Sequence, residues 1–112
     1  MRDSSREFRC PFCESPLAPP TELRSGLEVF EGGRCTTCGA VYVYDRTGRM
    51  LGEALSIALI FANDGDYDKA FSEGGEYEEA VIRYNQRLNI FSLGDGGRLD
   101  RSPKFFFLRL KG

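Results

Sequence analysis

The chain has no histidine and no tryptophan among its 112 residues. Without an imidazole, the Ser-His-Asp triad and metal ligation by histidine are both excluded. The apolar stretches fall short of the ~20 residues that a membrane-spanning helix needs. The N-terminus is polar, with charged residues at positions 2, 3, 6 and 7, and does not resemble a secretory signal peptide. We therefore expect a soluble, cytoplasmic protein that does not bind membranes.

Cysteine is scarce, and the four cysteines form two close pairs. Cys10 and Cys13 flank a Pro-Phe dipeptide, and Cys35 and Cys38 flank a Thr-Thr dipeptide. A Cys-x-x-Cys turn directs two sulfurs at one ion, and two such turns complete a tetrahedral cage of four thiolates. A closed cage leaves no coordination position for a reacting water, so it stabilises structure. The spacing predicts a structural zinc site with these four cysteines as ligands.

The two turns resemble the knuckles of the zinc ribbon family, which often read Cys-Pro-x-Cys-Gly and Cys-x-x-Cys-Gly. Pro11 matches the first knuckle, and Gly39 follows Cys38 in the second. Glu14 stands where the first knuckle often has glycine, which predicts a less regular turn. The resemblance covers roughly residues 8–44 and extends to small bacterial zinc-ribbon proteins without an assigned role. It implies an antiparallel zinc ribbon and leaves function open, because zinc ribbons serve many roles.

Three other uses of the cysteines compete with zinc. Two disulfides fit poorly with a chain that shows no secretory signal. The first pair resembles the motif of the glutaredoxins, but Pro16, Pro19 and Pro20 disfavour the helix that this redox chemistry requires. Rubredoxins hold iron in the same two knuckles, so a rubredoxin-like iron protein that transfers electrons remains an alternative.

Charge is unevenly distributed along the chain. The formal net charge is −2, and an acidic protein is a poor generic binder of nucleic acid. Residues 83–112 nevertheless carry seven basic and two acidic side chains. Arg9 and Arg34 each stand immediately before a cysteine pair, and we expect them to offset the negative charge of the metal–thiolate centre.

Hydrophobic patterning predicts an α+β fold with a boundary near residue 48. Residues 1–48 are expected to form the zinc ribbon, with strands at 21–30 and 41–44. Residues 49–112 are expected to form a small α+β lobe packed on the ribbon in one structural unit. The elements expected in this lobe are a buried helix at 53–63, a short helix at 67–72, a helix or a strand within 76–84, and a C-terminal β-hairpin of strands 88–93 and 104–111.

The last predicted strand has two different faces. Phe106, Leu108 and Leu110 alternate on a core face. The other face carries Phe105, Phe107, Arg109 and Lys111. Aromatic side chains beside basic ones are typical of surfaces that bind single-stranded nucleic acid. The alternative is that Phe105 and Phe107 pack inside the fold or against a second subunit.

No group of residues points to catalysis or to a small-molecule substrate, so we expect a protein that is not an enzyme. The favoured function is a non-catalytic zinc-binding adaptor or protein-interaction module, acting through a protein partner or as a homodimer. Binding of single-stranded RNA or DNA through the last strand is a second hypothesis.

Overall fold

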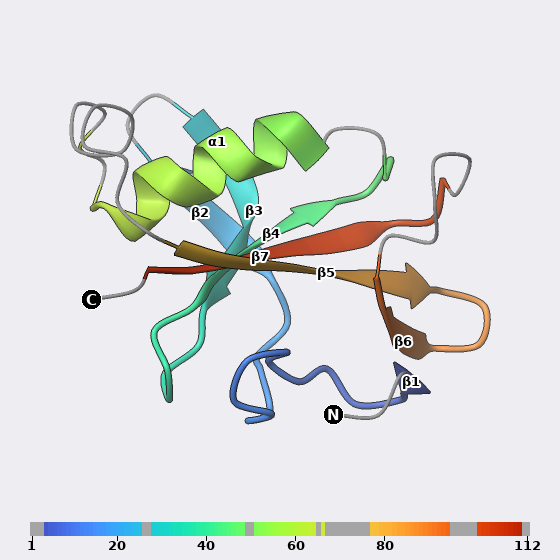
Figure 1. The fold of residues 1–112 in the computed structure, drawn as a ribbon. Helices are drawn as coiled ribbons and strands as arrows, with labels where there is room; N and C mark the ends of the chain where they lie inside the picture. The colour runs from blue at the N-terminus through green and yellow to red at the C-terminus, as the bar shows by residue number, and fades with distance from the viewer. Residues whose placement is uncertain are drawn as a thin grey trace.

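The computed structural model describes residues 4–25, 28–48, 51–64, 66, 77–94 and 101–110. Within these residues the chain forms seven strands and one helix, as Figure 1 shows. The elements are β1 (Ser4–Ser5), β2 (Thr21–Ser25), β3 (Glu28–Arg34), β4 (Val41–Asp45), α1 (Leu51–Ala62), β5 (Tyr77–Asn85), β6 (Ile90–Leu93) and β7 (Lys104–Leu110).

The strands form one antiparallel sheet in the order β1-β6-β5-β7-β4-β3-β2. The last strand, β7, lies at its centre, where Phe106 is opposite Val43 of β4 on one side and Val81 of β5 on the other. The predicted C-terminal hairpin of strands 88–93 and 104–111 is therefore wrong. β6 pairs with β5 through the turn at 86–89, and β7 pairs with β5 and β4.

The predicted α+β class with several short helices is also wrong, because the fold is mainly β with a single helix in the described residues. The ambiguous segment at 76–84 contributes to strand β5, where central pairing with β7 outweighs the weak local preference. The helix predicted at 67–72 lies outside the described residues. The domain boundary near residue 48 stays a prediction; β4 from before it and β7 from after it are neighbours in the sheet.

The segment predicted as one strand at 21–30 instead forms a hairpin of β2 and β3, with Leu23 opposite Phe30. Strand β3 continues through Gly32 and Gly33, which lie against Tyr42 of β4. A Cβ atom on Gly32 would stand 2.1 Å from the Tyr42 carbonyl oxygen, and one on Gly33 would stand 2.4 Å from its hydroxyl oxygen. Glycine is required here because the backbone of β3 approaches Tyr42 this closely.

Helix α1 covers one face of the sheet (Figure 1). Its sequence has almost no polar face, and it was predicted as a buried helix. Ala54 and Ala58 are buried against Val43, Phe106 and Leu108 of the central strands. Among the described residues, no helix has the length and apolarity that a membrane span requires.

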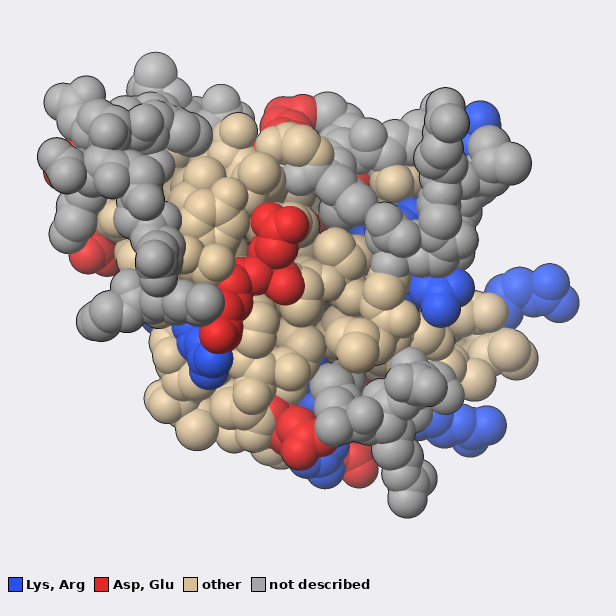
Figure 2. All heavy atoms as spheres, viewed as in Figure 1, with Lys and Arg blue, Asp and Glu red and all other residues tan. Residues whose placement is uncertain are grey.

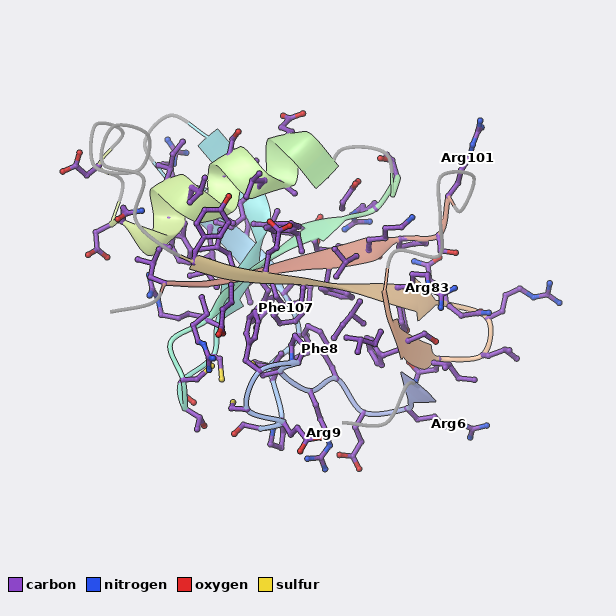
Figure 3. The ribbon with its side chains drawn as sticks, in the orientation of Figure 1. Arg6, Phe8, Arg9, Arg83, Arg101 and Phe107 are labelled. Atoms are coloured by element: carbon purple, nitrogen blue, oxygen red, sulfur yellow. The ribbon has the colours of Figure 1, made fainter. Side chains whose placement is uncertain are left out.

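The N-terminal segment covers the opposite face of the sheet. An aromatic layer packs this segment against the sheet, and it consists of Phe8, Tyr42, Tyr44, Tyr84, Phe91, Phe105 and Phe107. In Figure 3, Phe8 and Phe107 lie on this face, opposite α1. The Phe8 ring centroid is 4.5 Å from that of Phe105 and 5.4 Å from that of Tyr42. The Tyr42 hydroxyl also donates a 2.8 Å hydrogen bond to the Ala18 carbonyl. These contacts place the first cysteine pair, which follows Phe8, beside the sheet.

Candidate metal centre

The two cysteine pairs lie in turns with the same backbone hydrogen bonds. In the first turn, the Glu14 amide donates to the Cys10 carbonyl at 2.8 Å. In the second turn, the Gly39 amide donates to the Cys35 carbonyl at 2.9 Å. The chain therefore forms two equivalent knuckles, one before β2 and one between β3 and β4.

The residue after each pair has a left-handed backbone, with φ of 63° at Glu14 and 81° at Gly39. Glycine adopts this conformation without steric cost, whereas a residue with a Cβ atom does not. The first knuckle was expected to be a less regular turn because of Glu14, but its hydrogen bonds match those of the second knuckle. Glu14 therefore affects only the backbone strain of the turn.

The four cysteine sulfurs lie within 4.8 Å of one another. Sγ of Cys10 is 3.6 Å from Sγ of Cys38, and Sγ of Cys13 is 3.6 Å from Sγ of Cys35. Zinc–sulfur bonds of about 2.3 Å would place the corners of a sulfur tetrahedron ~3.8 Å apart. A disulfide needs about 2.05 Å, and all four cysteines are free thiols. The sulfur positions therefore fit a metal ion and do not fit two disulfides.

Burial differs within the site and sets the acidity of the thiols. Cys10 and Cys35 are buried, while Cys13 and Cys38 are half-buried. Burial raises the pKa of Cys10 to about 12 and also raises the pKa of Cys38. Side-chain and backbone hydrogen bonds from Ser15 lower the pKa of Cys13 to about 6. A metal ion that binds here at neutral pH must displace the protons of Cys10 and Cys38.

Arg109 of β7 approaches the site from the sheet. Its guanidinium carbon lies 4.8 Å from the centroid of the Phe12 ring, within the first knuckle, and its Nη2 forms an ion pair with Glu78 of β5. The hydrogen bond to Glu78 is the main reason that the pKa of Arg109 is raised. The negative charge of Glu78 and the nearby Cys38 sulfur raise this pKa further. Arg109 therefore lies against the first knuckle and close enough to Cys38 for their charges to interact, so its cation offsets part of the charge of a metal–thiolate centre.

The two arginines expected in that role also lie at the knuckles: Arg9 donates to the Glu14 carbonyl at 2.9 Å, and Arg34 donates to the Gly39 carbonyl at 3.5 Å. Arg9 pairs with Glu7 at 2.5 Å, and Arg34 donates to the Phe61 carbonyl at 3.2 Å with its guanidinium over the Phe61 ring. Their contacts in the described structure are to carboxylate, carbonyl and ring atoms. From the sequence alone, Arg109 was predicted only as a surface residue of the last strand, because its position beside the first knuckle depends on the central position of β7.

Two of the four residues considered for a nucleic-acid or partner surface on the last strand are buried in the fold. Phe105 and Phe107 are 4% and 0% exposed and belong to the aromatic layer, which confirms the alternative that they pack inside the fold. Arg109 is half-buried at the metal centre, and Lys111 lies outside the described residues.

No protein-family model matches the chain, and no curated protein or solved structure is significantly similar to it. The zinc-ribbon resemblance thus depends on the two knuckles alone. The geometry itself establishes that four cysteines from two knuckles lie where one metal ion can bind.

Proposed function

We propose that Cys10, Cys13, Cys35 and Cys38 hold one zinc ion and that the protein is a non-catalytic, zinc-stabilised binding module. The observation that supports this proposal most directly is that the four cysteine sulfurs all lie within 4.8 Å of one another. Four thiolate ligands are typical of structural zinc sites, which keep no open position for a substrate or a reacting water. The bound ion would supply a crosslink between the N-terminal segment and the β3–β4 connection.

The crosslink would matter for the stability of this chain. The N-terminal segment has few regular backbone partners, since the isolated bridge between Arg9 and Pro16 and the two-residue strand β1 are its only sheet-like pairings in the described structure. A structural zinc site contributes about 10–16 kcal/mol of apparent binding free energy at neutral pH. Zinc would therefore hold this segment, with Phe8, against the aromatic layer.

Because a closed metal site has no position for a substrate, the function of the protein must depend on other parts of its surface. We propose that the module acts by binding another macromolecule, either a partner protein or a second copy of itself. Iron in the same sulfur set is the competing possibility, because four tetrahedral thiolates suit both metals.

Cobalt substitution tests the ligand set directly. Co²⁺ added to metal-free protein should give the intense charge-transfer bands of a four-thiolate site, and one equivalent of Zn²⁺ should bleach them. Cys13→Ser should shift and weaken these bands, because it replaces one thiolate. A spectrum of octahedral cobalt with oxygen ligands would contradict the proposal.

A further inference from the structure

An aromatic pocket lies on the sheet face opposite α1, apart from the cysteines. Its volume is about 300 Å³. The lining residues, from the N-terminal segment and from strands β4 to β7, are Phe8, Leu17, Pro19, Pro20, Tyr44, Tyr84, Phe91 and Phe105. This volume is at the lower end of the range for ligand sites, so the pocket suits one small flat group.

The pocket walls are rings in stacked arrangement. Tyr44 stacks on Phe105 with centroids 4.6 Å apart, and Tyr84 stacks on Phe91 at the same distance. The lining contains no charged side chain. The Tyr84 hydroxyl also has a partner within the protein, since it donates to Asn89 at 2.8 Å. The pocket therefore offers aromatic ring surface for stacking. It offers few hydrogen-bonding groups that could select a ligand by its pattern of polar atoms.

Two exposed arginines stand close in the sequence to residues that line the pocket. Arg6 is exposed and stands two residues before Phe8, and Arg87 is exposed in the turn that follows Tyr84. Neither forms an ion pair with the described residues. In Figure 2, the end of the molecule at the right shows lysine and arginine side chains and no visible acidic side chain among the described residues. Figure 3 places Arg6 at this end, on the same side of the sheet as Phe8.

We propose that this pocket binds one base of a single-stranded nucleic acid, with Arg6 and Arg87 contacting the adjacent phosphates. Stacking rings beside unpaired cations are the two elements of recognition that single strands use. The local charge is complementary to a phosphate backbone although the protein as a whole is acidic. An extended proline-rich peptide also uses aromatic grooves, but it gains nothing from the flanking arginines.

The test uses the metal-loaded full chain and two labelled probes, ten-residue oligo(dT) and oligo(U), in anisotropy titrations at about 50 and 200 mM salt. We expect saturable binding that weakens steeply with salt. Tyr84→Leu should weaken binding about tenfold, because it removes a stacking ring. The matched control is Tyr77→Leu, at the other end of β5 and outside the pocket, which should leave binding unchanged.

A matched pair of charge variants tests the phosphate contacts. Arg87→Glu should lower affinity and reduce the salt slope by about one. Arg24→Glu makes the same charge change on the exposed β2 strand at the far edge of the sheet, and it should have little effect.

Photocrosslinking of wild-type protein with 5-iodouracil oligonucleotides keeps the test valid if a variant misfolds. The expected crosslinks are to Phe8, Tyr44 or Tyr84. No binding at the lower salt, or crosslinks only outside the pocket, would overturn the proposal. Equal losses of affinity in the Tyr84→Leu and Tyr77→Leu variants would also overturn it. So would a proline-rich peptide that binds the pocket in preference to the oligonucleotides.

Discussion

The guanidinium of Arg109, on the central strand β7, lies 4.8 Å above the ring of Phe12, inside the first cysteine knuckle. A cation over an aromatic face at this distance is attracted to the ring. Because the same side chain also pairs with Glu78 and lies near Cys38, it links strand β7 to the first knuckle and places a cation near the second.

Replacement of Arg109 should loosen the metal site. We expect Arg109→Ala to release zinc to a chromogenic chelator about tenfold faster than the wild type, as for other neighbours of metal ligands. Arg109→Lys should recover part of the loss, because it keeps the charge but not the planar guanidinium that pairs with Glu78 and lies over Phe12.

Arg24→Ala is the matched control, since Arg24 is exposed on β2 at the edge of the sheet. Its release rate should equal that of the wild type. Equal release rates in Arg109→Ala and Arg24→Ala would show that Arg109 has no role at the site.

Loss of one thiolate should unfold the N-terminal segment that carries the first knuckle. We expect Cys13→Ser or Cys38→Ser to abolish stoichiometric zinc binding and to expose the amides of the knuckles and of residues 14–20 to hydrogen exchange, because the crosslink is broken. Strands β4, β5 and β7 should stay more protected, since they also pack in the core under α1. A variant with wild-type melting and metal content would contradict the structural role of the site.

The left-handed residues of the two knuckles should respond in opposite directions. Gly39→Ala should destabilise the protein by roughly 1–2 kcal/mol, because φ is positive and a new Cβ would meet no atom within 4 Å, so only backbone strain changes. Glu14→Gly should raise stability by up to about 1 kcal/mol, since it relieves the same strain. Thermal melts of the zinc-loaded proteins measure both, and a stabilising Gly39→Ala would show that the knuckle geometry is different.

Phe107 should be essential to the core. Phe107→Ala removes a ring with no exposed surface and should cost about 3–5 kcal/mol in denaturant unfolding. Leu88→Ala is the control, because Leu88 is 59% exposed in the turn between β5 and β6, and it should change stability by less than about 0.5 kcal/mol. A stable Phe107→Ala protein that had lost only an interaction partner would restore the surface role first considered for this residue.

The sequence was sufficient to predict features that local chemistry determines. The spacing of Cys10, Cys13, Cys35 and Cys38 predicted one metal site, because two short turns bring sulfurs together regardless of the rest of the fold. The buried helix at 53–63 was close to the observed Leu51–Ala62, since its nearly continuous apolar composition predicts burial.

Long-range pairing was not predictable in the same way. Strand β7 carries apolar residues on both faces beside Lys104 and Arg109, which fits an edge strand with one exposed face or a central strand with none. Only the pairing with β4 and β5 shows that Phe105 and Phe107 are buried and that Arg109 lies over Phe12 of the first knuckle. The aromatic pocket has the same origin, because its walls come from separate strands and from the segment around Phe8.

Metal analysis of the purified protein tests the central claim most directly. Elemental analysis by mass spectrometry, combined with native mass spectrometry of the intact chain, gives the identity of the metal and its stoichiometry. We expect one zinc ion per chain, no absorption in the visible range, and loss of the ion in the Cys38→Ser variant. A red protein with one iron per chain, or a folded protein that binds no metal with its four cysteines reduced, would contradict the account.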